Sequence, residues 1–356
     1  MIKKITVSKT LSVVLLELLM LSVLLAQKPY RVGTTTANFL EIGYGVRENA
    51  MGDASVAAVR DLNSIYWNPA GLGFMRQSQA MAMYQPWYVG INTSFVGFGY
   101  VKPIWGTFAV GLIYTGYSDE EVTTVEMQEG TGEMYNGQEL AFSFSYGKRL
   151  VDWFSFGASM KYVNSRIWHE TGHAVAFDLG AIVNTRFFAW SDKPGDGLNI
   201  GMSIANYGTR MKYNGLDLKQ TKDIAPEEQG NYPYVPVKFE LEDWELPLLM
   251  RLGISAYAYK SEHHRLLLAI DAMHPNNNSE SINAGGEYTL TLPAYGEFSL
   301  RAGYKGLFMV DSQYGLSMGF GLRLNFLGNK SLIIDYAFRD LKTLGGTHSY
   351  SIGFVF

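Results

Sequence analysis

Large apolar residues alternate with small or polar residues along most of the chain, most clearly at residues 314–326. Every even position there carries a large apolar side chain, and every odd position is small or polar. Because successive side chains of a β-strand point to opposite faces, the segment predicts a strand with one apolar face and one polar face. A tilted strand of about nine to eleven residues crosses a bilayer, so the pattern favours a membrane strand.

The alternation recurs from residue 77 onward, in about fourteen segments. With the segments numbered from residue 77, most even-to-odd connections are short, and the one near residues 191–197 is somewhat longer. Two odd-to-even connections, residues 118–136 and 208–245, are long. Short turns on one side and long loops on the other are typical of bacterial outer-membrane barrels. We therefore predict an all-β membrane protein: an antiparallel outer-membrane β-barrel of about fourteen strands over residues 77–356, with its long loops outside the cell.

The first 76 residues do not alternate. Lysines near the start precede an apolar stretch at residues 11–25 and then Ala26, which is the order found in a secretory signal peptide. We predict a cleaved signal peptide at residues 1–26, with a transmembrane anchor or a buried helix as the alternative. Residues 27–76 predict a small helical plug. Four alanines favour a helix between residues 47 and 60, and Asn68-Pro69-Ala70-Gly71 predicts a tight turn after it.

The composition fits a barrel. Hydrophobic residues make up 47% of the chain and charged residues 17%, yet mean hydropathy is close to zero. A barrel averages its lipid-facing and lumen-facing residues in this way, whereas a helical membrane protein does not. The net charge of −4 gives no reason to expect a nucleic-acid partner, and the absence of cysteine excludes disulfides and thiolate metal sites. Many of the 38 glycines fall at inward positions, where they leave space for a plug against the wall.

Charged residues recur on the inward side of the predicted strands. Because an ionised side chain is costly against lipid, we expect these groups to face the lumen. The carboxylates should pair with the arginines or with the backbone of the plug. We interpret the set as electrostatics between barrel and plug, and a catalytic carboxylate pair is the alternative. The residues are Asp178, Asp271 and Asp335 together with Arg251, Arg301 and Arg323.

A literal H-E-x-x-H pattern is formed by His169, Glu170 and His173. The pattern binds zinc on a helix, where the two imidazoles lie one turn apart. Here it lies between two alternating segments and contains Gly172, so we expect an extracellular loop. A protease site or an adventitious metal contact are the alternatives. No phosphate-binding glycine loop or nucleophile elbow accompanies it, and we expect no enzyme activity, no metal site and no cofactor.

Two stretches of the predicted plug resemble the N-terminal hatch of two related groups of outer-membrane proteins. Residues 48–54 include Ala50-Met51-Gly52-Asp53, and residues 65–72 include Asn68-Pro69-Ala70-Gly71. One group is the FadL-type transporters of hydrophobic molecules, and the other is the PorV/PorQ family of type IX secretion. The C-terminal half resembles PorV/PorQ more closely. Its matching stretches are residues 286–288, 300–305, 319–322, 335–338 and 346–351.

The resemblance implies a fourteen-stranded barrel with a plug, located in the outer membrane of a Gram-negative-type envelope. PorV-like proteins bind the C-terminal signal of secreted cargo at the cell surface and pass it to an attachment complex. The implied partners are the secretion translocon, cargo C-terminal domains and outer-membrane lipid. The hatch motif is shared by both groups, so a FadL-like channel for uptake of hydrophobic small molecules is the alternative. Candidate partner contacts in the second long loop are Tyr232, Tyr234 and Trp244, with a floppy surface loop as the alternative.

Overall fold

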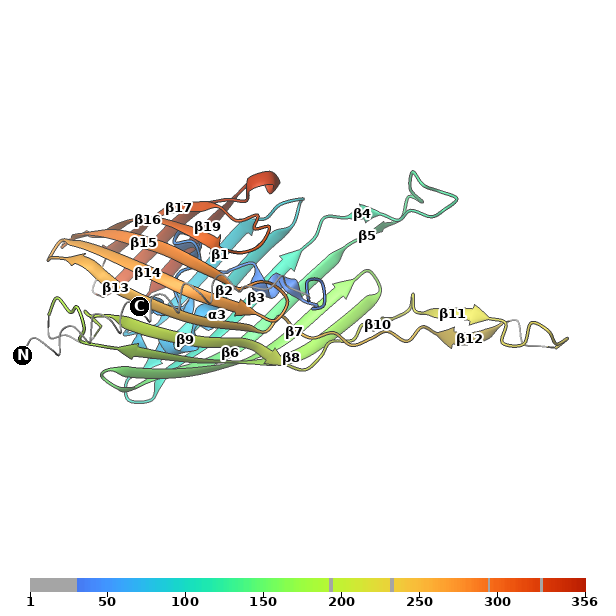
Figure 1. The fold of residues 1–356 in the computed structure, drawn as a ribbon, viewed down its shortest axis with the longest axis horizontal. Helices are drawn as coiled ribbons and strands as arrows, with labels where there is room; N and C mark the ends of the chain where they lie inside the picture. The colour runs from blue at the N-terminus through green and yellow to red at the C-terminus, as the bar shows by residue number, and fades with distance from the viewer. Residues whose placement is uncertain (1–30, 192–194, 231–233, 294, 327–328) are drawn as a thin grey trace, which may run out of the picture.

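The computed structural model describes residues 31–356 except 192–194, 231–233, 294 and 327–328, so the predicted signal peptide lies outside the described residues. In the described part, fourteen long strands form one closed antiparallel barrel (Figure 1). The sheet closes because β1 pairs with β19, from Gln79↔Val355 to Tyr84↔Tyr350. The barrel strands are β1 (Gln79–Pro86), β2 (Asn92–Lys102), β3 (Gly106–Gly116), β6 (Gly137–Val151), β7 (Phe154–Ile167), β8 (Glu170–Asn184), β9 (Asn199–Gly208), β13 (Leu249–Lys260), β14 (His264–Pro275), β15 (Ser281–Leu292), β16 (Gly296–Leu307), β17 (Leu316–Phe326), β18 (Lys330–Asp340) and β19 (Gly346–Val355).

The faces of the strands follow the predicted alternation. In β17, Leu316, Met318 and Phe320 are exposed on the outer face, whereas Ser317 is buried on the inner face. The other strands repeat this arrangement and give the barrel an apolar outer surface. No helix in the described residues is both long enough and apolar enough to span a bilayer.

The predicted sorting of the connections is also confirmed. Turns such as residues 152–153 and 261–263 are short at one end of the barrel, and the two long connections lie at the other end. Each long connection forms a hairpin that projects beyond the barrel (Figure 1). In the first, β4 (Glu120–Glu121) pairs with β5 (Met134–Tyr135). In the second, β11 (Lys219–Lys222) pairs with β12 (Val235–Lys238), and β10 (Asn214–Gly215) pairs with the first two residues of β8.

Among the described residues, four short helices precede β1 and fill the lumen (Figure 1). They are η1 (Asn38–Glu41), α2 (Val46–Ala50), α3 (Ser64–Trp67) and η2 (Pro69–Phe74); the described part has one further helix, η3 (Lys342–Leu344), in the loop before β19. The main hydrophobic core therefore lies between this plug and the inner wall, where Trp67 of the plug and Phe95 of β2 are buried in one cluster.

The predicted helix between residues 47 and 60 is wrong beyond Ala50. The chain turns at Gly52 and Asp53, which both have a φ of +65°. Helix propensity is overridden there because the backbone at Met51 and Gly52 is pressed against β16. The backbone N–H groups of Ser55 and Val56 then bind Asp271 of the wall instead of a carbonyl in a helical turn. The predicted tight turn at Asn68 is the start of a six-residue 3₁₀ helix, η2, with Pro69 at its first position.

Candidate functional site

The contact between plug and wall is so close that several wall positions leave no room for a side chain. A Cβ on Gly180 would lie 2.0 Å from Asn68 Oδ1, and one on Gly285 would lie 2.1 Å from the carbonyl oxygen of Met51. A Cβ on Gly157 would lie 2.3 Å from the carbonyl carbon of Pro69. The inward glycines therefore do make space for the plug.

Two adjacent glycines of β15 allow this role to be tested. A Cβ on Gly285 would collide with the Met51 carbonyl of the plug. A Cβ on Gly286 would lie 3.1 Å from Leu268 Cδ2, which is the end of a flexible side chain, and would touch no atom of the plug. We expect Gly285→Ala to lower the free energy of unfolding by about 1–3 kcal/mol, because the backbone of the plug must move. Gly286→Ala should change it by less than about 0.5 kcal/mol. Urea titration of the barrel in detergent measures both, and equal effects would contradict the assignment.

The first half of the hatch motif ends helix α2. Ala50 and Met51 are fully buried, and a Cβ on Gly52 would lie 2.4 Å from the backbone nitrogen of Tyr304 in β16. Asp53 then turns its carboxylate toward two basic residues of the wall. Lys305 Nζ lies 2.7 Å from Asp53 Oδ2, and Arg339 pairs with Oδ1.

The second half of the motif acts through Asn68. Its Oδ1 accepts the backbone N–H of Ala70 at 3.1 Å, which caps η2. Its Nδ2 donates to the carbonyl of Val56 at 2.9 Å and to that of Ala181 in β8 at 3.2 Å. One buried amide thus joins two turns of the plug to each other and to the wall. Pro69, Ala70 and Gly71 follow as buried residues of η2.

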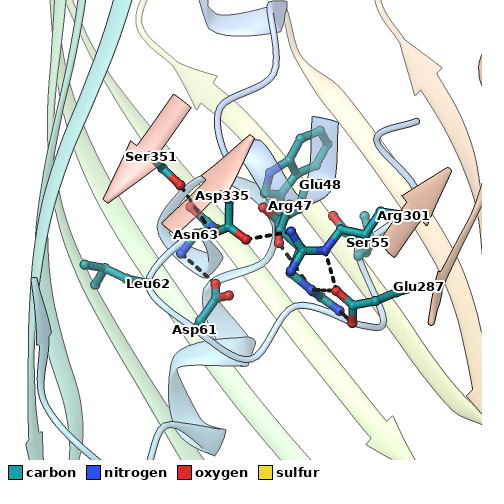
Figure 2. Close-up of polar contacts among 12 residues, drawn as sticks. Arg47, Glu48, Ser55, Asp61, Leu62, Asn63, Glu287, Arg301, Asp335 and Ser351 are labelled. Carbon is teal, nitrogen blue, oxygen red and sulfur yellow. Dashed lines mark hydrogen bonds and ion pairs between the residues drawn. The ribbon is translucent and has the colours of Figure 1, made fainter. Parts of the chain in front are cut away.

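A buried ion-pair network clamps α2 to four strands (Figure 2). Arg47 makes a bidentate pair with Glu287 of β15, with both N–O distances at 2.8 Å. Glu287 also pairs with Arg301 of β16 at 2.6 Å, and Arg301 pairs with Asp335 of β18 at 2.6 Å. Ser351 of β19 donates to Asp335 at 3.3 Å. Each charge has an opposite partner, which a buried charge requires.

A second cluster surrounds Arg339 of β18. Besides pairing with Asp53, its Nη2 donates to Asn49 Oδ1 at 2.9 Å, and its Nη1 donates to the carbonyl of Ile42 at 3.3 Å. These contacts hold the chain on both sides of α2. Together the two clusters join the plug to β15, β16, β18 and β19.

The carboxylates predicted to face the lumen all do so. Asp335 pairs with Arg301, as described above. Asp271 accepts the backbone N–H groups of Ser55 at 2.6 Å and Val56 at 2.8 Å, and it therefore binds the plug backbone. Asp178 pairs instead with Lys161 Nζ, at 2.6 Å, within the wall.

The other two predicted arginines form no carboxylate pair among the described residues. Arg251 lies over the rings of Tyr66 and Trp67 in α3, with its guanidinium carbon 5.2 Å from each ring centroid. It is fully buried, and this stacking attaches the plug to β13. Arg323 lines a cavity of about 280 Å³ between the plug and the short-turn end of the barrel.

Glu48 is a buried acid of the plug that the sequence did not single out as a site. Its side chain is fully buried in α2. Glu48 Oε1 lies 3.4 Å from Arg47 Nη1, and Oε2 has no hydrogen-bond partner among the residues that the structure describes. Burial, followed by repulsion from Asp61, raises the pKa of Glu48 from 4.5 to about 8. Asp61 is also affected, because burial raises its pKa.

The raised pKa of Glu48 predicts a dependence of stability on pH. The folded state holds the proton of Glu48 more tightly than the unfolded chain, so this stabilisation is complete below pH 4.5 and is lost as pH rises through about 8. We expect the urea midpoint of the native protein to fall between pH 5 and pH 9, and Glu48→Gln to reduce that fall. Glu126→Gln, in the exposed first hairpin, is the control. A fall of the same size in both variants would contradict the role of Glu48.

The predicted partner contacts lie on the second projecting hairpin. Tyr234 is 80% exposed beside β12, and Tyr232 lies outside the described residues. Trp244 is 42% exposed at the base of the hairpin, where its backbone exchanges hydrogen bonds of 2.8 and 2.9 Å with Met211. Tyr234 is therefore displayed, whereas Trp244 belongs partly to the support of the hairpin.

The H-E-x-x-H segment is extended rather than helical. His169 lies in the turn before β8, with Nδ1 3.0 Å from Asp217 Oδ1. His173 points outward from β8 and stacks on Tyr162, with ring centroids 6.4 Å apart. The two imidazoles therefore do not form the zinc-binding pair of a helix. In the part of the chain that the structure describes, no three His, Asp or Glu side chains are grouped to hold a metal ion.

Comparison with known families decides the class of this barrel. The sequence model of the family described as "Type IX secretion system protein PorV" matches residues 25–225, which is more than half of the 356 residues. The chain belongs to the PorV family. It is thus an outer-membrane barrel of type IX protein secretion. Among curated protein sequences, none matches the chain.

Solved structures similar to this PorV-family barrel share its fold. The toluene transporter TodX of Pseudomonas putida is 14% identical with a TM-score of 0.52, over 88% of this chain and 96% of that chain. The toluene transporter TbuX of Ralstonia pickettii is 13% identical with a TM-score of 0.52, over 88% and 97%. The monoaromatic hydrocarbon channel CymD is 12% identical with a TM-score of 0.54, over 88% and 97%. At these identities the likeness shows a FadL-like fold and nothing finer.

Several residues that fix the plug of this PorV-family barrel were missed in the sequence. Glu287, Arg339 and Lys305 all lie at inward positions of their strands, so the alternation carried a signal for them. Arg47 and Asn49 lie in the plug, where no alternation exists to indicate which side chains meet the wall.

Proposed function

We propose that this PorV-family barrel binds the C-terminal signal of secreted proteins at the cell surface and hands the cargo to an attachment complex. In this proposal no molecule passes through the lumen, and the partners bind at the end of the barrel that carries the long loops. No catalytic step is required of the barrel, and no cofactor. Its partners are the translocon, cargo C-terminal domains and the lipid around the apolar outer face.

The observation that carries the proposal is a clamped plug combined with two projecting hairpins at one end. Ion pairs, hydrogen bonds and glycine contacts fix the plug to the wall on β8, β14, β15, β16 and β18. A plug held at that many places is costly to displace on every transport cycle. The hairpins, by contrast, add exposed area where a large partner approaches (Figure 1).

A second candidate is uptake of hydrophobic small molecules. It is favoured by the fold shared with TodX and TbuX, which are described as toluene transporters. The cavity beside the plug argues against it, because Arg60, Arg323 and Glu297 are among the charged residues that line the cavity. A pathway for aromatic hydrocarbons would have an apolar lining.

Deleting the gene and measuring cargo in the culture medium tests the first function. We expect cargo to remain cell-associated with its C-terminal signal uncleaved, and the native gene to restore secretion. Normal secretion by the deletion strain would refute the proposal. Uptake of radiolabelled toluene by vesicles containing the purified barrel tests the second candidate, and uptake above that of empty vesicles would support it.

A further inference from the structure

The first projecting hairpin is strongly acidic. Residues 118–136 carry six carboxylates and no lysine or arginine: Asp119, Glu120, Glu121, Glu126, Glu129 and Glu133. In the described chain, none of these carboxylates lies within ion-pair distance of a basic group. The hairpin therefore projects an unbalanced negative charge beyond the barrel (Figure 1).

A pocket of about 530 Å³ opens at the base of this hairpin. Aromatic rings from four parts of the chain line it, together with Glu120 and Asn136 of the hairpin itself. The rings are those of Phe39 in the plug, Tyr117 after β3, Tyr135 in β5 and Tyr213 before β10. The pocket and the acidic hairpin are thus one continuous surface.

Glu139 of β6 lies among the lining residues of this pocket with its side chain directed inward. The residue is 8% exposed, accepts the Tyr117 hydroxyl at 2.6 Å and accepts Ser165 Oγ at 3.2 Å. Tyr213 in turn donates to Ser165 at 2.8 Å. No basic group of the described residues pairs with Glu139. Arg166 also lines the pocket, but its position on β7 is exposed.

We propose that the pocket and the acidic hairpin form a docking site for a basic polypeptide segment of a secretion partner, with one lysine or arginine side chain inserted toward Glu139. The inference rests on the proposed function, because it names the chemistry of the partner that the surface receives. The faces of the tyrosine rings attract a cation by cation–π interaction, and the carboxylate attracts it by its negative charge. The six carboxylates of the hairpin steer a basic segment toward the pocket.

A polypeptide fits this surface better than a small amine. Beyond the pocket, the hairpin exposes Val125, Met127 and Met134, with exposed fractions of 85%, 52% and 54%. An amine that fills only the pocket would leave those side chains in water, whereas an extended segment covers them. The two short strands β4 and β5 also offer backbone edges to an extended partner.

The test uses the full-length barrel in detergent and a fluorescein-labelled dodecapeptide of alternating lysine and leucine. Two matched peptides carry acetyl-lysine or glutamate in place of lysine. We expect the lysine peptide to bind at least about tenfold more tightly than either control. Glu139→Gln should weaken its binding by about tenfold without affecting the controls. Changing Glu126, Glu129 and Glu133 together to Gln should reduce the association rate at low salt and flatten its salt dependence.

Glu228→Gln, on the other projecting hairpin, is the matched control and should bind like the native protein. Because Glu139→Gln alters a buried site, Tyr135→Ala at the pocket rim provides a second variant, with folding checked by heat-dependent gel mobility. Equal binding of the lysine and acetyl-lysine peptides, or native affinity in both pocket variants, would overturn the inference.

Secretion by the same variants separates the two proposals. Loss of secretion in the deletion strain together with normal secretion by Glu139→Gln and Tyr135→Ala would refute the docking site alone. Normal secretion in the deletion strain would refute the proposed function itself.

Discussion

Replacing Glu287 by alanine is expected to lower the free energy of unfolding by about 3–5 kcal/mol. Glu287 is the shared partner of Arg47 and Arg301, and its removal leaves two guanidinium groups facing each other in a buried site. The plug should loosen before the barrel does, because Arg47 is its anchor in α2. Urea titration measures the loss, and limited proteolysis at residues 47–60 reports the loosening of the plug.

Glu228→Ala, on an exposed loop, is the control for Glu287→Ala and should change stability by less than about 0.5 kcal/mol. Replacing Arg47, Glu287, Arg301 and Asp335 together by Met, Leu, Met and Leu tests whether the ion pairs add stability or only fix the position of the plug, because that variant leaves none of the four charges unpaired. Well-packed apolar residues often replace a buried ion network without loss. A single variant Glu287→Ala as stable as the native protein would show that the network does not hold the plug.

Asn68→Leu is expected to cost about 2–4 kcal/mol, by a different mechanism. Leucine has the same number of side-chain heavy atoms as asparagine, but it leaves the Ala70 N–H and the carbonyls of Val56 and Ala181 without the amide. Because the Ala70 and Val56 groups are buried and the Ala181 carbonyl is partly buried, water does not replace the amide at low cost. The urea midpoint and the yield of folded barrel measure the effect.

The control for Asn68→Leu is Asn92→Leu. Asn92 accepts a hydrogen bond from Tyr84 at 2.8 Å, but it does so on the exposed surface, where water substitutes for the amide. We expect a change below about 0.5 kcal/mol for that variant. Similar losses in both variants would mean that Asn68 contributes no more than a surface amide.

Much of the barrel could be predicted from the sequence because each strand has one face toward lipid and one face toward the lumen. These two environments require alternating apolar and polar residues. Leu316 and Phe320 had to be apolar and Ser317 small whatever the neighbouring strands were. The lengths of the connections likewise showed which end of the barrel carries the long loops. Such features need only a few adjacent residues and no knowledge of distant contacts.

The plug was less predictable because distant contacts decide its shape. The alanines of residues 50–58 favour a helix, yet the chain leaves the helix at Met51 to fit its backbone against Gly285 and Gly303. Arg47 and Glu287 lie 240 residues apart, and no local rule pairs them. The alternation showed that Asp178 faces inward but did not give the register that pairs it with Lys161.

The candidate surface site had a similar mixed outcome. Loop length indicated where partners approach, and Tyr234 is displayed there. The pocket at the first hairpin was not found, because Tyr117, Tyr135 and Tyr213 come from separate connections and Phe39 from the plug. The one local signal was the run of acids without a base between residues 118 and 136.

The pairing of β1 with β19 sets an order of events for assembly. The ladder that starts at Gln79↔Val355 joins the first and the last strand of the barrel along the chain, so the barrel closes only after every other strand has reached the membrane. The plug is synthesised before the strands that it contacts. Its charged side chains therefore remain hydrated until β15, β16 and β18 form around them. Residues 35–76 precede every strand of the barrel, yet they are therefore among the last parts of the chain to reach their native contacts.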